Sequence, residues 1–150
     1  MDDERFKNAY DLSASGEEEK GLEEIKLFIQ NNPKVWNAWF LLGWGLRKLE
    51  RFEDAKQAFL EALKYGGEKN PDTYNELSLC LVAEKKFDEA KSALQKAMAL
   101  DPDSTKIVSN LGYIALAQGD EEEARKCFSI VLELDPKDAI AAAELDKLEK

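Results

Sequence analysis

The feature that most constrains this chain is a sequence pattern that returns about every 34 residues. The pattern opens with a large residue and a Leu-Gly pair and continues with a small, an aromatic and a second small residue. Its clearest copy is Trp39, Leu42, Gly43, Ala55, Phe59 and Ala62. A fixed period of this length is typical of a solenoid of helix-turn-helix units. We therefore expect stacked helix pairs, each packing on its neighbours, rather than one central core.

The later copies keep the spacing and change some residues. They are Tyr74, Leu77, Ser78, Ala90, Leu94, Ala97 and Pro102, followed by Val108, Leu111, Gly112, Ala124, Phe128, Val131 and Pro136. A weaker copy precedes them at Gly21, Ile25, Phe28 and Pro33. The pattern resembles the tetratricopeptide repeat (TPR) family, strongly over about residues 33–138 and weakly over 2–32.

The expected fold is all-α. The TPR resemblance implies antiparallel helix pairs in a right-handed superhelix, an α-solenoid, with about four TPR units and a C-terminal capping helix in one domain, residues 1–150. The expected units are approximately 2–35 (divergent), 36–70, 71–104 and 105–138, with the cap at 139–150. The divergent first unit lacks the Leu-Gly pair, as suits a terminal repeat whose outer face meets water.

Apolar periodicity and helix-end signals place the individual helices. The expected ranges are 2–14, 17–30, 36–49, 52–65, 71–84, 87–99, 105–118, 121–134 and 138–149. Asn70 is an expected N-cap, with Pro71 in the first turn of its helix. Gly66 and Gly67 end the preceding helix, and the first of them suits a left-handed C-terminal cap. The extra residue of the 35-residue spacing between Ala55 and Ala90 belongs in this turn.

The expected helix over 36–49 carries two stripes. The first is Trp39, Leu42, Gly43 and Leu46, which we expect to face the helix over 52–65 as buried core. Glycine inside a helix costs about 1 kcal/mol relative to alanine. Gly43 therefore indicates a place where two helices nearly touch. The second stripe is Asn37, Phe40, Leu41, Trp44, Arg47 and Lys48.

The TPR resemblance implies that the first helices of successive units line a concave groove, which binds extended or helical peptide segments. Stepping by one repeat gives four rows. These are Asn37, Asp72 and Lys106; Phe40, Asn75 and Ser109; Trp44, Leu79 and Tyr113; and Arg47, Val82 and Leu116. The candidate peptide-binding residues are Asn37, Phe40, Trp44, Arg47, Lys48, Asn75, Leu79, Lys106, Asn110 and Tyr113.

Aromatic side chains flanked by polar donors are typical of a binding hot spot. This favours the row that contains Trp44 and Tyr113 as the centre of the groove. The alternative is that both residues pack on neighbouring helices or on the N-terminal helix.

Two features bear on the charge of a ligand. Some TPR domains hold a C-terminal carboxylate with asparagines and bases, but the corresponding positions here are Lys7, Leu41, Glu76 and Asn110. This set does not favour a carboxylate. Arg47, Lys48 and Arg51 make 36–70 the only unit that is not acidic. They either suit a ligand with an apolar anchor and an acidic neighbour or match the dipole at a helix end.

No residue pattern indicates catalysis, a metal site or a cofactor. The chain has no histidine, and neither a glycine-rich phosphate loop nor a nucleophile elbow is present. The acidic runs 17–19 and 121–123 open helices and match the helix dipole. Cys80 and Cys127 are expected to be two buried thiols that act as small hydrophobes.

Charge and hydropathy narrow the class of partner. The chain has 31 acidic and 21 basic residues and a net charge of −10. This disfavours nucleic acid and anionic membrane surfaces, because both require a basic face. Apolar runs are too short to span a membrane, and the acidic N-terminus does not resemble a signal peptide. A cytoplasmic location is expected.

The expected function is a non-catalytic scaffold or adaptor that binds a peptide or helix of a partner protein. Three alternatives remain open. One is a small secretion-type chaperone that shields an apolar segment of its client. Another is a homo-oligomer in which the groove takes a neighbour's N-terminal helix. The last is a module of a longer enzyme or regulator.

Overall fold

The computed structural model describes residues 17–150, so the helix expected over 2–14 lies outside the described part. The described residues form eight α-helices and one short 3-10 helix, without any β-strand. The elements are α2 (Glu18–Asn31), α3 (Trp36–Lys48), α4 (Phe52–Lys64), η1 (Gly67–Lys69), α5 (Pro71–Ala83), α6 (Phe87–Leu100), α7 (Thr105–Ala117), α8 (Glu121–Leu134) and α9 (Ala139–Leu148). Each described helix lies within about one residue of its expected range.

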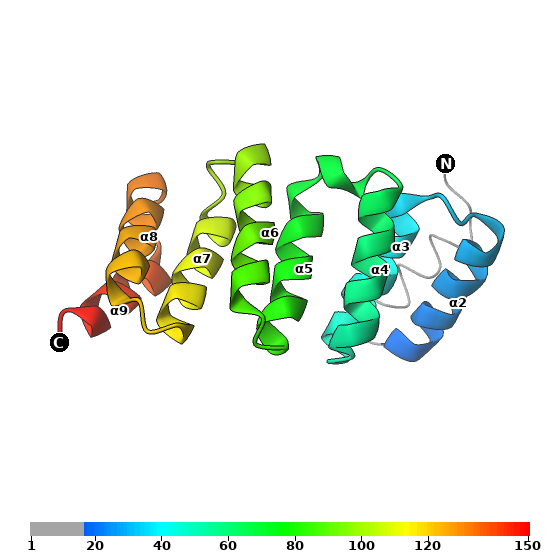
Figure 1. The fold of residues 1–150 in the computed structure, drawn as a ribbon, viewed down its shortest axis with the longest axis horizontal. Helices are drawn as coiled ribbons and strands as arrows, with labels where there is room; N and C mark the ends of the chain where they lie inside the picture. Colours follow the sequence, from blue (N-terminus) through cyan, green and yellow to red (C-terminus); the bar gives the residue numbers. More distant parts are fainter. Residues whose placement is uncertain (1–16) are drawn as a thin grey trace.

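The helices stand side by side and follow one another along the long axis of the molecule (Figure 1). The most extensive contacts join α3 to α4, α5 to α6 and α7 to α8, and further contacts join each pair to the next. Successive helices are therefore neighbours in space, as expected for repeats that pack on one another. The expected all-α solenoid is confirmed.

The junction between α4 and α5 follows the local signals in the sequence. The Asn70 side chain accepts a hydrogen bond of 2.8 Å from the backbone N–H of Asp72, and Pro71 is the first residue of α5. Gly66 has a φ of 121°, a conformation that side-chain-bearing residues rarely adopt. The short helix η1 that follows was not predicted. It contains the extra residue of this turn.

The close approach predicted at Gly43 is confirmed. A Cβ atom at Gly43 would lie 2.8 Å from Cε1 of Phe59, whose side chain is fully buried. The same arrangement recurs between Gly112 and Phe128, where the nearest ring atom would lie 2.8 Å away. Each glycine leaves room for the aromatic ring of the paired helix. The spacing between the glycine and the aromatic residue, which is the same in these two copies of the pattern, thus has a direct steric cause.

Trp39 differs from the prediction that it is buried core. Its side chain is half-buried, and its indole N–H donates a hydrogen bond of 2.8 Å to the backbone carbonyl of Pro33. The ring packs against the core while remaining partly exposed, and its hydrogen bond ties it to the connection that leads into α3. Removing the Trp39 ring is therefore expected to cost less than removing a fully buried ring.

A cluster of charged side chains joins α4 to the connection between α5 and α6. The Lys56 Nζ atom lies 2.8 Å from Oε2 of Glu53 and 3.0 Å from Oε2 of Glu84. The Lys86 Nζ atom lies 3.0 Å from the same Glu84 oxygen. Hydrogen bonds from Lys86 and Lys56 lower the pKa of Glu84 from 4.5 to about 2. The ionised form of Glu84 is thus favoured in the folded chain.

Replacing Glu84 by glutamine is expected to lower the free energy of unfolding at pH 7. A carboxyl group whose pKa is lowered on folding stabilises the protein above its unfolded pKa. The difference between wild type and Glu84→Gln should therefore shrink as the pH falls from about 5 toward 2. Urea unfolding at pH 7 and at pH 3 measures this difference. A difference that grows on acidification would contradict the assignment.

Candidate functional site

A hollow of about 470 Å³ opens across the side of the molecule formed by α3, α5 and α7. Helix α3 contributes an apolar wall, whereas α5 and α7 contribute a charged wall. The lining residues are Asn37, Phe40, Leu41, Trp44, Asp72, Glu76 and Lys106. We refer to this hollow as the α3–α5–α7 groove. A volume of this size lies within the range of about 300–1,000 Å³ that is common for ligand sites.

The apolar wall is held in place from behind. The ring of Phe40 packs edge-on against Phe59, with 5.6 Å between ring centroids, and lies 6.2 Å from the ring of Trp36. The Lys48 ammonium lies 4.6 Å from the centroid of the Trp44 ring, in cation–π distance. Phe40 and Trp44 are both half-buried. Each ring therefore offers an exposed part to a ligand while its position is fixed by its neighbours.

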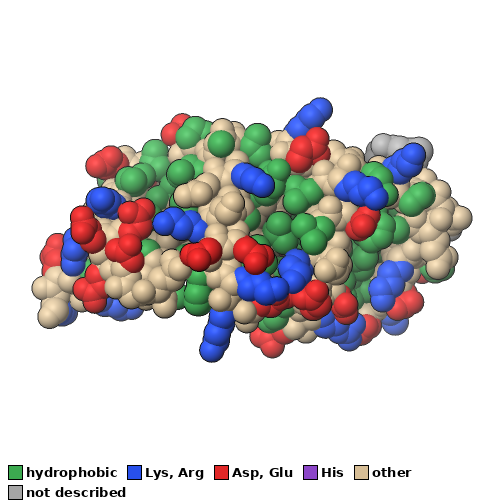
Figure 2. Space-filling view, in the orientation of Figure 1, with side chains coloured by type: hydrophobic (Ala, Val, Ile, Leu, Met, Phe, Trp, Pro, Cys, Tyr) green, Lys and Arg blue, Asp and Glu red, His purple; other side chains and the backbone are tan. Residues whose placement is uncertain are grey.

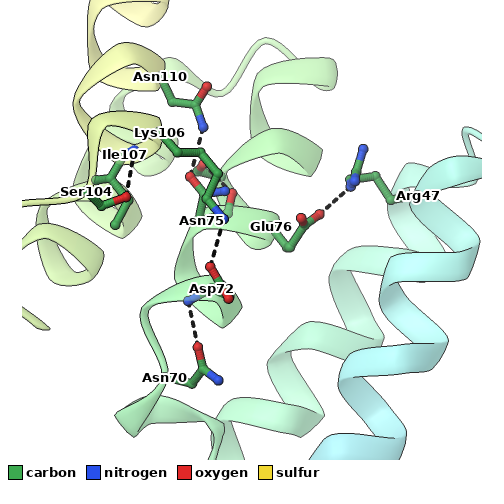
Figure 3. A network of polar contacts seen from close by, with 10 residues as sticks. Arg47, Asn70, Asp72, Asn75, Glu76, Ser104, Lys106, Ile107 and Asn110 are labelled. Carbon is green, nitrogen blue, oxygen red and sulfur yellow. Dashed lines mark hydrogen bonds and ion pairs between the residues drawn. The ribbon is translucent and has the colours of Figure 1, made fainter. Parts of the chain in front are cut away.

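The charged side chains of α5 and α7 take part in two ion pairs, one of them with Arg47 of α3, and Figure 3 shows both. Lys106 lies 2.9 Å from Asp72, and Arg47 donates a hydrogen bond to Glu76. The pKa of Glu76 is raised, because burial of its carboxyl group outweighs the favourable effect of Arg47. The charges of the groove are thus balanced within the protein.

Asn75 was predicted as a groove contact, but its side chain is only 1% exposed. Its Oδ1 atom accepts a hydrogen bond of 2.8 Å from the Asn110 amide, so the two asparagines join α5 to α7 (Figure 3). The Ser78 hydroxyl donates to the Asn75 backbone carbonyl at 2.6 Å. Asn75 is therefore part of the interface between helices and is not accessible to a ligand. Asn110 is half-buried, and its amide is already used by Asn75.

The row of Trp44, Leu79 and Tyr113 is not brought together in one hollow. Only Trp44 lines the α3–α5–α7 groove. Leu79 is half-buried, and Tyr113 is 40% exposed farther along the solenoid. The Tyr113 ring packs edge-on against Phe128 at 5.2 Å between centroids. Of the two aromatics in this row, Tyr113 is thus the one that packs on a neighbouring helix.

The basic cluster of α3 and the following turn is paired within the protein. Arg47 contacts Glu76, Lys48 lies 3.8 Å from Glu18, and Arg51 contacts Glu19. Of the two alternatives for these bases, the acidic ligand loses support, because each base already has an acidic partner within the chain. Their partners come from α2 and α5. These pairings could not be predicted from the sequence, because the paired residues lie far apart along the chain.

Three groove residues were missing from the predicted set. Asp72, Leu41 and Glu76 all line the hollow, and Leu41 and Glu76 occupy equivalent positions one repeat apart. Leu41 and Glu76 occupy positions at which some TPR domains hold a carboxylate, and neither side chain is a donor for one. Asn37, Phe40, Trp44 and Lys106 are the predicted residues that the structure brings together in the groove.

The described part of the chain offers little for other chemistries. Cys80 and Cys127 are free and buried, as expected, and burial raises the pKa of their thiols to about 12 and about 11. Within residues 17–150, no group of three or more histidine, cysteine, aspartate or glutamate side chains is placed to hold a metal ion. No described helix combines the length and apolar character that crossing a membrane requires.

The family follows from these repeats and from sequence comparison. Profiles described as tetratricopeptide repeat match residues 6–72, 40–105 and 81–147. The chain belongs to the TPR family. The fold and the family together define a protein-interaction scaffold, a class whose members are generally not catalysts.

Two curated relatives share part of their sequence with this chain. The cytochrome c-type biogenesis protein CycH of Bradyrhizobium diazoefficiens is 28% identical over 128 residues, which are 83% of this chain and 34% of CycH. Heat shock protein STI1 of Saccharomyces cerevisiae is 27% identical over 99 residues, which are 66% of this chain and 17% of STI1. The chain spans about a third of CycH and less of STI1.

Several solved structures share the fold. MamA superposes with a TM-score of 0.87 at 16% identity, covering 93% of this chain and 81% of MamA. YrrB, described as a TPR protein with an unusual peptide-binding site, gives 0.82 at 26% identity, covering 96% and 74%. The first TPR of Spaghetti (RPAP3), bound to the HSP90 peptide SRMEEVD, gives 0.71 at 27% identity, covering 76% and 90%. The similarity to MamA concerns the fold alone.

Proposed function

We propose that this chain is a non-catalytic scaffold whose α3–α5–α7 groove binds an internal segment of a partner protein. The observation that carries the proposal is the groove itself. It places Phe40, Leu41 and Trp44 along one wall of a hollow of about 470 Å³. Two half-exposed aromatic rings with fixed positions supply contact area at a low cost in side-chain entropy. A large apolar residue of the partner is the anchor that such a wall fits.

The opposite wall argues against recognition of a C-terminal carboxylate. Glu76 lines the groove, and a ligand carboxylate near it would meet like charge. Leu41 offers no donor, and the Asn110 amide is engaged by Asn75. The peptide in the Spaghetti structure, SRMEEVD, is acidic near its end. We expect the present groove to bind such a peptide poorly and to prefer an uncharged internal segment.

The ion pairs of the groove set orientation more than affinity. The side chains of Lys106 and Asp72 are 57% and 51% exposed, and an exposed pair of this kind contributes at most about 1 kcal/mol. Because both groove carboxylates already have basic partners, we expect binding to depend weakly on salt. The similarity to two solved structures supports a peptide ligand. YrrB is described as having a peptide-binding site, and the Spaghetti TPR is bound to a peptide.

A chaperone for an apolar client segment would use the same groove. The two roles differ in selectivity, since a chaperone of this kind should protect its client from aggregation as well as bind it. Light scattering of the partner, with and without the scaffold, separates them. Self-assembly is tested by sedimentation, in which a monomer over a wide concentration range would exclude it.

Replacing Trp44 by alanine is expected to weaken partner binding at least tenfold, or by about 1.4 kcal/mol. A partner is first captured from lysate of the source cell, and its bound segment is then made as a labelled peptide for fluorescence anisotropy. Trp39→Ala is the matched control, because Trp39 is a half-buried tryptophan of the same helix that does not line the groove. Its affinity should stay unchanged at a temperature where both variants are folded. Equal affinity of Trp44→Ala and wild type would contradict the proposal.

A further inference from the structure

A second hollow of about 470 Å³ lies between α4 and α6, with α5 as its floor. We refer to it as the α4–α6 groove. It shares no lining residue with the α3–α5–α7 groove. Figure 2 shows hydrophobic side chains gathered in this part of the surface, between charged ones. Leu60 lines the groove and is 44% exposed.

The α4–α6 groove is larger than the hollow at the next joint of the solenoid. The corresponding hollow beside α7, which residues of α6, α7 and α8 line, has a volume of only about 10 Å³. The connection that leads into α5 is also the longer one. It covers residues 65–70 and includes η1, whereas residues 101–104 lead into α7. The longer connection, with its one extra residue, thus lies at the joint that carries the α4–α6 groove.

The floor of the groove has the spacing of a helix surface. Tyr74, Leu77 and Leu81 line it at positions i, i+3 and i+7 of α5. The two rim helices, α4 and α6, run in the same direction (Figure 1). Seven residues of helix extend about 10 Å, so the floor matches two turns of a third helix. An amphipathic helix presents its apolar face with this same period.

The α6 rim of the groove carries two charged side chains without an ion-pair partner among the described residues. Glu89 and Lys96 both line the groove and lie seven residues apart, and neither forms an ion pair with another described residue. The Lys96 ammonium lies 5.8 Å from the centroid of the Tyr74 ring. Lys56, by contrast, is neutralised by Glu53 and Glu84. A complementary helix would place a basic residue beside Glu89 and an acidic residue beside Lys96.

We propose that the α4–α6 groove is a second binding site, which takes an amphipathic helix of a partner protein. The helix carries apolar residues at i, i+3 or i+4 and i+7, with a basic and an acidic residue about two turns apart facing Glu89 and Lys96. This site is independent of the α3–α5–α7 groove, and a scaffold with both sites can hold two segments at once.

The test is a displayed library of 15-residue helices, randomised on one face and selected against the wild-type chain. Enriched peptides should show the apolar spacing and the pair of opposite charges. Their affinity, measured by fluorescence anisotropy, should fall at least tenfold in Leu60→Lys. Leu100→Lys is the matched control, because Leu100 is a 45% exposed leucine of α6 outside the groove. It should bind as wild type does.

Charge reversal tests the orientation of the helix. Lys96→Glu should weaken binding of the enriched peptide at least threefold, and a peptide with a base in place of its acidic residue should restore it. Trp44→Ala should bind the peptides unchanged, and its response separates this site from the α3–α5–α7 groove. Absence of enrichment, equal affinity of Leu60→Lys and wild type, or loss of binding in Trp44→Ala would each overturn the second site. Concentration-dependent dimerisation of the wild type that Leu60→Lys abolishes would contradict the proposal of a partner helix. A second copy of the chain would then be the occupant of the groove.

Discussion

Replacing Phe59 by alanine is expected to lower the free energy of unfolding by about 3–5 kcal/mol. The Phe59 side chain is fully buried and fills the space beside Gly43, where α3 and α4 approach each other. It also supports Phe40 from behind, with 5.6 Å between ring centroids. Its removal leaves a cavity that the neighbouring helices cannot close, because both are held by further contacts. The groove wall should therefore loosen together with the core.

Urea unfolding followed by far-ultraviolet circular dichroism measures this effect. Leu60→Ala is the matched control, since Leu60 follows Phe59 in α4 but is 44% exposed. A surface substitution of this kind usually changes stability by about 0.5 kcal/mol or less. A loss below about 1 kcal/mol in Phe59→Ala would mean that the Phe59 ring does not stabilise the packing of α3 on α4 to the expected extent.

Replacing Gly43 by leucine is the second change with a large expected effect. Even a Cβ atom would lie 2.8–2.9 Å from three atoms of the Phe59 ring. Overpacking of a core costs about 1–3 kcal/mol, whereas removing a glycine from a helix gains up to about 1 kcal/mol. We expect a net loss of about 2 kcal/mol, because leucine adds three further carbon atoms beyond the Cβ position.

The steric origin of this loss can be tested directly. Ala99→Leu enlarges an exposed side chain of α6 and should leave the free energy of unfolding nearly unchanged. The double variant Gly43→Ala with Phe59→Leu should lose less free energy of unfolding than the two single variants lose together. The smaller side chain at position 59 makes room for the methyl group added at position 43. Strict additivity would show that Gly43 and Phe59 do not compete for the same space.

Much of the fold could be predicted from the sequence because its determinants are local or periodic. Asn70 and Pro71 begin α5 through interactions within one turn. Gly43 and Phe59 recur with the repeat, so their contact could be inferred from spacing alone. The solenoid has few long-range choices, since each helix packs on the next one in the chain.

The candidate site was less predictable because side-chain pairing across helices decides it. Stepping along the repeats placed Asn37, Phe40, Trp44 and Lys106 on one face, and all four line the α3–α5–α7 groove. The same procedure could not reveal that Asn110 would turn to Asn75 and bury it. The partners of the basic cluster were equally hidden, because Arg47 and Glu76 lie 29 residues apart. Periodicity thus predicts which residues share a face, whereas the hydrogen bonds between them decide which remain open to a ligand.

Membership of the TPR family gives this chain its class, and the groove must supply its specificity. The groove combines a fixed aromatic wall with charges that are neutralised by Arg47 and Lys106. Under the proposed function, a partner is therefore selected by the shape of an apolar residue more than by net charge. This distinguishes the proposal from simple electrostatic attraction of a basic partner.

Site-specific photo-crosslinking tests the central claim most directly. A photoreactive residue is placed at Asn37, in the α3–α5–α7 groove, and in a second variant at Gln95, an exposed residue of α6 outside both grooves. We expect the residue at position 37 to crosslink an internal segment of the partner that contains a large apolar residue, and the residue at position 95 not to crosslink it. Crosslinks from Gln95 alone, or crosslinks from Asn37 to the partner's C-terminal residues, would contradict it.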